Sequence, residues 1–300
     1  MKRVFIIENP AASRSTPQGL RIVEDALGSA GYGVESRRTE GPGAATRLAA
    51  DAAAAGFDII AVYGGDGTVM QAVEGMRDSG AVLGLIPGGT SNLLASNLRI
   101  PRDPRQAARI IASGAARTID LVRLKTSEGT RFYSVGAGTG YDADMMAETT
   151  TEQKKRWGVF AYVAFVLRTA HRIRPRALTV TVDGASGEYE AASVIVANCA
   201  EILPPILKLG ADVTIDDGVL DVILLKADGF FGAAIAVWNL LRLRETSRVQ
   251  RIRGREVTIE TAEPQVVQAD GDICGTTPFT ATMIKGGLTV IAPVVGRSGS

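Results

Sequence analysis

Three short segments in the first hundred residues combine glycine with oxygen-bearing side chains. They are ENPAAS at residues 8–13, GGDGT at 64–68 and PGGTSN at 87–92. Each follows an apolar run of strand length and precedes a segment whose apolar residues have helical spacing. Glycine lets backbone N–H groups come close to a phosphate, and the N-terminus of a helix carries partial positive charge. Together the three segments predict a binding site for a polyanion such as a nucleotide.

The segment GGDGT carries a single carboxylate, Asp66. A carboxylate beside phosphates is repelled unless a cation accompanies them, so we expect Asp66 to face the metal ion that travels with a nucleotide phosphate. Any one glycine turn alone would be better explained by tight strand-to-helix geometry, whereas three at consecutive junctions favour a ligand site. The common nucleotide fingerprints G-x-x-x-x-G-K-[ST] and G-x-G-x-x-G with a later acidic residue do not apply.

The elements that must position these turns alternate between strand-length apolar runs and segments of helical period, from residue 1 to about 120. Such alternation is typical of repeated β-α units, and the apolar runs suit central strands of a parallel sheet that is covered on both faces. Because ligands bind at the carboxyl ends of parallel strands, the three turns should converge on one open α/β layer. The predicted elements lie at 3–8, 18–29, 32–38, 44–55, 58–63, 68–78, 81–87 and 103–112.

After Asp120 the sequence changes to alternating, β-branched stretches separated by Gly, Asp and Pro. This pattern is typical of antiparallel sheets, and helical segments at 152–171 and 228–243 interrupt it. We therefore predict a nucleotide-binding domain at 1–120 and a β-rich domain at 121–300, and leave open whether the last residues pack back on the first domain. The predicted strands of the second half lie at 177–184, 189–199, 218–225, 255–261, 265–272 and 288–293.

Composition narrows the class of protein. The chain has 300 residues, of which 46% are hydrophobic and 22% are charged, as in ordinary globular proteins. A formal charge of +1 gives no global attraction to nucleic acid, so no nucleic-acid partner is expected. Cys199 and Cys274 lie far apart without metal-ligand spacing, which indicates a reducing compartment. The N-terminal apolar run is too short for a signal peptide and no segment reaches membrane-span length, so we expect a cytoplasmic protein.

The order and intervals of these motifs resemble those of the diacylglycerol kinase catalytic-domain superfamily, which includes bacterial soluble lipid kinases and sphingosine kinases. Asn9-Pro10 resembles the N-P-x-(S/A) opening of that family, GGDGT its signature of the same letters, and residues 87–92 its P-x-G-T-x-N loop. Landmarks in the second half separate the chain from the NAD kinases, which share G-G-D-G-T. They lie at 134–145, 157–163, 215–222 and 268–272.

The resemblance implies that the first domain is similar to NAD kinases and phosphofructokinases, that the second is β-sandwich-like, and that the catalytic cleft lies between them. It also implies that ATP is bound by the first domain, with Asn9 and Asn92 supporting the crevice. The residues that it assigns to ATP contacts are Thr39, Gly64, Gly65, Asp66, Gly67, Thr68, Val69, Met70, Gly89 and Thr90. The chain departs from the usual D-G-T-x-N-E-x-x-N-G at Met70, Gln71 and Glu74.

A magnesium site is also implied by the resemblance, at the turn Asp217-Gly218. There the Asp217 carboxylate and the backbone carbonyls of Thr214 and Val219 would hold a structural Mg²⁺. An oxygen-rich acidic turn suits a hard cation. A plain β-turn with Asp and Gly in their usual places explains the same residues equally well.

The general base is where the chain departs most from the family. The family's proposed base is the glutamate of a D-G-E triplet, and here the triplet is Asp270-Gly271-Asp272. We assign to Asp272 the task of accepting the proton of the acceptor hydroxyl, with Asp270 able to share it because two aspartates two apart on a strand share a face. The shorter side chain matters, since a misplacement of about 1 Å can lower the rate roughly 10²-fold. The alternative is two solvated acids at a turn.

For the acceptor, the sequence offers two helix-length apolar segments with Lys and Arg at both ends, 152–176 and 229–255. Basic ends can engage anionic lipid headgroups, although amphipathic helices packed on a sheet explain the pattern better. We expect His171 on the surface without a catalytic role. Six arginines are expected to form a solvated face: Arg242, Arg244, Arg248, Arg251, Arg253 and Arg255.

The sequence thus leads to the hypothesis of an ATP- and Mg²⁺-dependent kinase that phosphorylates a hydroxyl of diacylglycerol or a related lipid. Peripheral contact with the inner face of the membrane is compatible with this hypothesis, and the sequence leaves open whether the chain forms a homodimer. Two rivals remain. One is a non-catalytic nucleotide or lipid sensor with a weakened base, and the other is a kinase of a soluble acceptor such as NAD.

Overall fold

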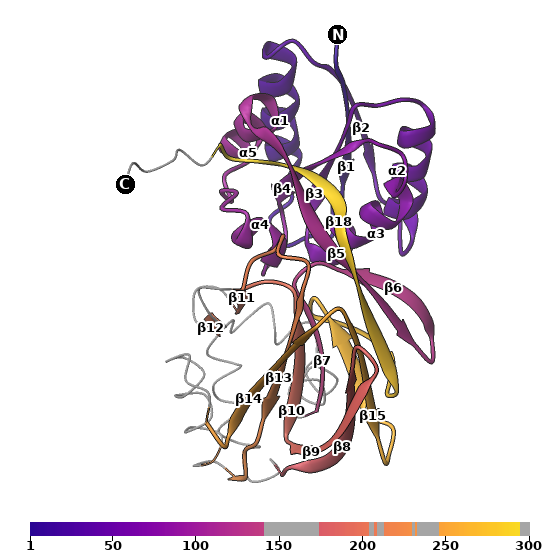
Figure 1. Cartoon of the computed structure of the whole chain (residues 1–300). Helices are drawn as coiled ribbons and strands as arrows, with labels where there is room; N and C mark the ends of the chain where they lie inside the picture. The colour runs from indigo at the N-terminus through magenta and orange to yellow at the C-terminus, as the bar shows by residue number, and fades with distance from the viewer. Residues whose placement is uncertain (141–173, 204–206, 209–212, 230–231, 233–245, 295–300) are drawn as a thin grey trace. The chain divides into compact units, whose positions relative to one another are not determined.

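The computed structural model of the chain describes residues 1–140, 174–203, 207–208, 213–229, 232 and 246–294. It divides into two compact units, the first made of Met1–Ile119 with Gly286–Ser300 and the second of Asp120–Lys285. The chain leaves the first unit within strand β5 (Ala115–Thr126) and returns to it within β18 (Phe279–Ala292), as the colours in Figure 1 show.

The first unit is built on a parallel sheet of strand order β2-β1-β3-β4, with the end of β18 beside β4 through Val290 and Leu83. Apolar residues of β1 and β3 are fully buried, as continuous apolar strands between two helical layers must be. The strands are β1 (Arg3–Glu8), β2 (Gly33–Arg38), β3 (Ile59–Gly64) and β4 (Val82–Pro87).

Helices cover both faces of this sheet. Helix α1 packs against α5 and α2 against α3, and Figure 1 shows the two pairs on opposite sides of the strands. Thr16 caps α1 by accepting from Gly19 N, and Asp103 caps α5 by accepting from Gln106 N, each followed by a proline that suits the first helical position. The helices are α1 (Pro17–Ser29), α2 (Ala44–Ala54), α3 (Asp66–Met76), α4 (Leu93–Asn97) and α5 (Pro104–Ser113).

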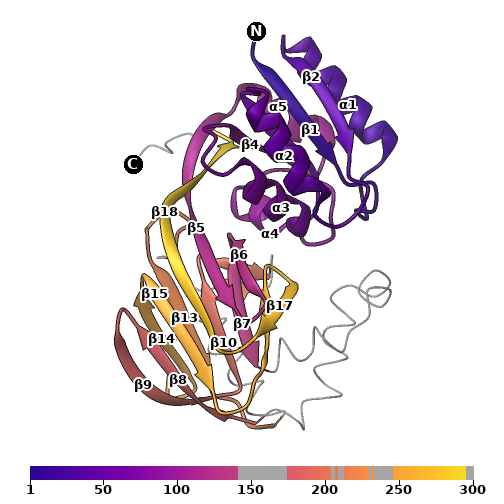
Figure 2. The ribbon, with the colours of Figure 1, turned by 90° about the vertical axis from the view of Figure 1, so that its right-hand side faces the viewer.

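The second unit is a sandwich of two antiparallel sheets. One contains β18-β15-β8-β9 in that order, and the other, in the described residues, contains β14-β13-β10-β7-β16-β17, with β17 at its edge (Figure 2). Apolar side chains of both sheets meet in one buried cluster, which includes Val180, Val196, Val222 and Val257. The remaining strands are β6 (Gly129–Tyr133), β7 (Gly136–Gly140), β8 (Arg176–Val182), β9 (Ala185–Ala191), β10 (Ser193–Ala197), β11 (Glu201–Leu203), β12 (Leu207–Lys208), β13 (Leu220–Leu225), β14 (Val249–Gly254), β15 (Glu256–Thr261), β16 (Val266–Ala269) and β17 (Asp272–Thr276).

The predicted fold class, an α/β layer followed by an antiparallel β-sandwich, is confirmed. The sequence pattern missed the short helix α4 and the strands β5 to β7, β11, β12, β14 and β17. The predicted strand at 288–293 exists, but it pairs parallel to β4 in the first unit rather than joining an antiparallel sheet.

Several expectations fall on residues that the structure does not describe. The predicted helix at 152–171, the landmark at 157–163 and His171 lie outside the described residues, and so does most of the predicted helix at 228–243. Within the described ranges, no helix has the length and hydropathy that spanning a bilayer requires.

Candidate functional site

The three glycine-containing turns of the first unit are joined to one another by backbone hydrogen bonds. Gly88 N donates to Gly64 O at 2.8 Å, Arg14 N donates to Gly88 O at 2.8 Å, and Asn9 N donates to Tyr63 O at 2.9 Å. The structure therefore brings together the segments 8–13, 64–68 and 87–92 at the carboxyl ends of β1, β3 and β4.

Glycine is required where two of these turns meet. A Cβ atom on Gly89 would lie 2.6 Å from the Cα of Gly65, closer than real Cβ contacts come. A Cβ on Gly88 would lie 3.2 Å from Gly64 N. The backbones of the two turns touch because neither carries a side chain there, which leaves their surface open to a ligand.

Helix α3 begins at Asp66 without a side-chain cap. Its first backbone hydrogen bond runs from Val69 N to Gly65 O at 3.1 Å, and the N–H groups of Gly67 and Thr68 have no partner in the described part of the chain. Such unpaired N–H groups carry the positive end of the helix dipole and can bind a phosphate. Asp66 lies at this end and accepts from Leu94 N at 3.4 Å.

The two asparagines hold the turns in shape. Asn9 donates from Nδ2 to Thr68 Oγ1 at 2.8 Å and accepts from Ala11 N at 3.0 Å. Asn92, in a left-handed conformation at φ 53°, accepts from Gly89 N at 2.9 Å and donates to Gly89 O at 2.8 Å. Both amides are thus engaged by the protein itself, which supports a positioning role.

The remaining predicted nucleotide residues are spread around these turns. Ser13 and Thr90 share a hydrogen bond between their hydroxyl oxygens at 3.2 Å. Thr39 N donates to Glu8 O at 2.8 Å, so Thr39 follows the end of β2, next to β1. Val69 is buried in the core and its N–H is bonded to Gly65 O, whereas Met70 is half-buried.

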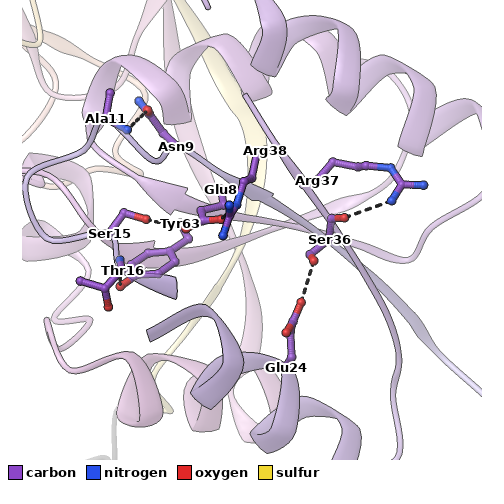
Figure 3. Close-up of polar contacts among 10 residues, drawn as sticks. All are labelled: Glu8, Asn9, Ala11, Ser15, Thr16, Glu24, Ser36, Arg37, Arg38 and Tyr63. Carbon is purple, nitrogen blue, oxygen red and sulfur yellow. Dashed lines mark hydrogen bonds and ion pairs between the residues drawn. The ribbon is translucent and has the colours of Figure 1, made fainter. Parts of the chain in front are cut away.

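Six residues that sequence reasoning missed fasten the turn after β1, and Figure 3 labels five of them. The buried Glu8 accepts from Arg38 Nε at 2.8 Å and from Ser15 Oγ at 3.2 Å. The hydroxyl of Tyr63 donates to Arg14 O at 3.0 Å, while its own oxygen accepts from Thr16 N at 3.3 Å. Glu8 meets Arg38 because the register of β1 and β2 sets them opposite each other, and the sequence alone gives no signal for that register.

Arg14 is the sixth of these residues. Its backbone is held by Gly88 and Tyr63, and its exposed side chain has no ion pair or hydrogen bond among the described residues. An uncommitted guanidinium beside the glycine turns can neutralise a phosphate with bidentate hydrogen bonds.

In the second unit, Asp270 and Gly271 form the two-residue turn between β16 and β17. Both have positive φ, 47° and 91°, as a type I′ hairpin turn requires. The Asp270 carboxylate accepts from the N–H groups of Ser134, Val135 and Gly136 at 2.9 to 3.0 Å and from the Ser134 hydroxyl at 3.2 Å. Burial raises the pKa of Asp270, and these hydrogen bonds oppose the rise.

Asp272 differs from Asp270 in every one of these respects. It begins β17, lies opposite Ala269, is exposed, and its carboxylate has no hydrogen bond among the described residues. The expectation that the two aspartates share a strand face is wrong, because the turn at Asp270-Gly271 separates them. Asp270 acts as an anchor of the hairpin, and Asp272 is the carboxylate available to a substrate.

The acidic turn that the family resemblance linked to magnesium is bonded by N–H donors. Asp217 Oδ1 accepts from Val219 N at 3.0 Å, and Asp217 Oδ2 accepts from Arg253 at 2.9 Å. Thr214 O accepts from Asp217 N at 3.5 Å. Among the residues that the structure describes, no group of three or more His, Cys, Asp or Glu could hold a metal ion. As placed, these residues do not fit a divalent cation.

Comparison with known proteins gives matches over both units. Residues 3–124 match the model of the diacylglycerol kinase catalytic domain, and residues 135–292 match the YegS C-terminal NAD kinase beta sandwich-like domain. A Bacillus subtilis (strain 168) protein named diacylglycerol kinase is 30% identical over 98% of this chain and 97% of its own length.

Two further matches show the extent of the likeness. An uncharacterised protein of Synechocystis, sll0036, is 26% identical over 80% of this chain, and the match spans 56% of that protein's length. The crystal structure of a Bacillus anthracis protein, described as a candidate diacylglycerol kinase, is 26% identical, covers 98% of both chains and has a TM-score of 0.82.

Proposed function

The chain belongs to the diacylglycerol kinase family of lipid kinases, and on that premise we propose that it transfers the γ-phosphate of ATP to a hydroxyl of diacylglycerol or a related lipid. The joined glycine turns of the first unit carry the nucleotide part of the proposal. The exposed carboxylate of Asp272 carries the catalytic part.

The triphosphate of ATP would bind where the backbones of Gly64-Gly65 and Gly88-Gly89 meet at the N-terminus of α3. The unpaired N–H groups of Gly67 and Thr68 supply hydrogen bonds to phosphate oxygens, and Arg14 supplies a positive charge. Mg²⁺ enters as part of the nucleotide substrate and neutralises charge on the phosphates. Asp66, at the first turn of α3, is the carboxylate that would face that cation in this proposal.

The acceptor proton goes to Asp272 in the proposed reaction. As the acceptor oxygen forms its bond to the γ-phosphorus, the bond from that phosphorus to the β–γ bridging oxygen breaks, which releases ADP. The hydroxyl proton moves to the Asp272 carboxylate, which has no competing hydrogen bond among the described residues. Asp270 holds the hairpin that carries Asp272 through its four hydrogen bonds to Ser134, Val135 and Gly136.

The acceptor class rests on the family rather than on a described pocket. A lipid acceptor requires that the protein contact a membrane surface peripherally, at the inner face if the protein is cytoplasmic. Kinase activity on a soluble acceptor such as NAD would appear as the competing outcome of the same assay.

A second candidate function follows from one observation, the aspartate at position 272. Its carboxylate is one methylene shorter than that of the glutamate expected from the resemblance, so a nucleotide-binding sensor with little turnover is the alternative. Replacing Asp272 by Glu separates the two: a large gain of activity favours the sensor, and a loss favours an enzyme adapted to aspartate.

The test is an acceptor panel with the purified full chain, labelled ATP and Mg²⁺. Diacylglycerol, a sphingoid base and phosphatidylglycerol are presented in mixed micelles, and NAD in solution. We expect a phosphorylated product from diacylglycerol or another of the lipids. Product from none of the lipids, with the protein folded and ATP bound, would reject the lipid kinase assignment.

A further inference from the structure

An arginine binds the acidic turn of the second unit at the place where the family resemblance put a metal ion. Arg253 donates from Nη2 to Asp217 Oδ2 at 2.9 Å, and its Nε lies 3.1 Å from Asp221 Oδ1. One guanidinium thus links the turn before β13 to the strand itself. The register of β13 and β14, which sets Asp221 opposite Arg253, fixes this contact.

The carboxylate at the centre of this contact needs a cation. Asp221 is fully buried, with 0% of its side chain exposed, whereas Arg251 is 17% and Arg253 is 40% exposed. Arg251 Nε also donates to Asp221 Oδ1, at 2.5 Å. A carboxylate removed from water is costly unless positive charge accompanies it, and two guanidinium groups here balance Asp217 and Asp221. The expectation of a solvated face is therefore wrong for Arg251, whereas Arg253 is exposed and pairs with carboxylates as well.

Both carboxylate oxygens of Asp217, the side chain that would ligate a divalent ion here, already accept hydrogen bonds from N–H donors. Mg²⁺ and Ca²⁺ require six or more oxygen ligands around them, but Val219 N–H occupies Asp217 Oδ1 and Arg253 occupies Asp217 Oδ2. The side-chain stem of Lys285 also lies alongside, because a Cβ on Gly218 would come within 2.9 Å of Lys285 Cδ. A metal ion at this turn would have to displace Arg253 from Asp217.

The turn is also tied to the first residue of the second unit. Gly218 N donates to Asp120 Oδ2 at 2.6 Å, and Asp120 is buried. Asn198 Nδ2 then donates to Asp120 O at 3.3 Å and to Ser134 O at 2.8 Å. Arg253, by binding Asp217, therefore stabilises a turn that is hydrogen-bonded to Asp120 and, through Asn198, linked to Ser134.

We propose that Arg253 is the built-in cation of this turn, so that the second unit of this chain folds without the structural magnesium ion that the resemblance implied. The side chain bridges Asp217 and Asp221 as a divalent ion would, but with a permanent charge and directed N–H donors. This inference concerns folding and metal binding, and it holds whether or not the chain is a lipid kinase.

Thermal unfolding of the full chain without nucleotide tests the inference. The melting temperature of the unmodified protein should be the same in EDTA and in millimolar Mg²⁺ or Ca²⁺. Arg253→Ala should lower it by about 5–10 °C in EDTA, because Asp217 loses its cation and the buried Asp221 keeps only Arg251 among the described residues. The melting temperature of Arg253→Ala should then rise part of the way back when Mg²⁺ or Ca²⁺ is added. Asp221 Oδ2, which is buried without a hydrogen-bond partner in the described residues, becomes an available ligand for that ion.

Two variants control the experiment. Arg255→Ala removes an exposed arginine that follows β14 and whose side chain makes no hydrogen bond or ion pair among the described residues. Its melting temperature should stay close to that of the unmodified protein in either buffer. Arg253→Lys keeps the charge and should fold without cation dependence, which keeps the test valid if Arg253→Ala does not fold.

Two outcomes would overturn the inference. The first is a Mg²⁺-induced rise in the melting temperature of the unmodified protein that Asp217→Asn abolishes, because it would place a metal ion at the turn. The second is an Arg253→Ala protein that is destabilised yet equally insensitive to divalent ions. Titration with Mn²⁺ followed by electron paramagnetic resonance gives an independent readout: one bound ion lost in Asp217→Asn would also contradict it.

Discussion

Asn9 Nδ2 lies 2.8 Å from Thr68 Oγ1, so the turn after β1 is bonded to the first turn of α3. Asn9→Ala removes this bond together with the one from Ala11 N. Each such hydrogen bond contributes about 1 kcal/mol, and the variant loses one or both of them as supports of the ATP site. KM for ATP should therefore rise about 5- to 30-fold, with little change in melting temperature. Ser113→Ala, which loses a bond within α5 only, should leave KM unchanged. An unaltered KM in Asn9→Ala would show that the bond from Asn9 to Thr68 does not support ATP binding.

Gly89→Ala tests the meeting of the two glycine turns. The new Cβ would lie 2.6 Å from Gly65 Cα, so one of the turns must move. We expect at least about a tenfold loss of ATP affinity, since a displacement near 1 Å at such a site is costly. Gly28→Ala is the matched control, because its Cβ would have no heavy atom within 4 Å. Isothermal titration calorimetry with an ATP analogue measures the affinity of each variant. Equal affinities of Gly89→Ala and Gly28→Ala would contradict the proposed phosphate site.

The side chain of Arg14 is expected to contact the triphosphate. Arg14→Ala should raise KM for ATP about 10-fold or more and weaken the binding of ATP more than that of adenosine, because only the phosphates carry charge. Arg105→Ala, on the exposed side of α5, is the control. If Arg14→Ala weakened adenosine and ATP equally, the arginine would be acting on the fold of the turn rather than on phosphate.

The buried thiol of Cys274 predicts a pH dependence. Burial raises the pKa of Cys274 to about 11 from an ordinary 9.0. The neutral thiol is therefore the form compatible with the fold: this contribution to stability is complete below about pH 9 and is lost as pH rises through about 11. In Cys199→Ser, where Cys274 is the remaining cysteine, alkylation by iodoacetamide should stay slow until pH approaches 11. A rate that rises with a midpoint near pH 9 would show an accessible thiol instead.

Local pattern was sufficient to predict the β-α units and the meeting of their turns, because apolar runs of strand length and apolar residues at helical spacing are local signals. Helix α4 escaped prediction because it has five residues and starts after Asn92 in a left-handed conformation. Such a short element has too little periodicity to be recognised.

Contacts set by strand register could not be predicted from one sequence. Glu8 meets Arg38, and Asp221 meets Arg253, only because neighbouring strands align at those positions. The same limit produced the wrong expectation for Asp270 and Asp272. Their spacing fits a shared strand face, whereas the hydrogen bonds of Asp270 to residues 134–136 fix a turn between them.

The role of Asp272 is tested most directly by the turnover number for phosphate transfer from ATP to diacylglycerol in mixed micelles. The account predicts that Asp272→Asn lowers kcat at least about 100-fold while ATP affinity is kept, because general base catalysis typically contributes 10²–10⁴-fold. Asp25→Asn, an exposed position on α1, should match the unmodified enzyme. An Asp272→Asn protein that turns over at the unmodified rate would contradict the central claim.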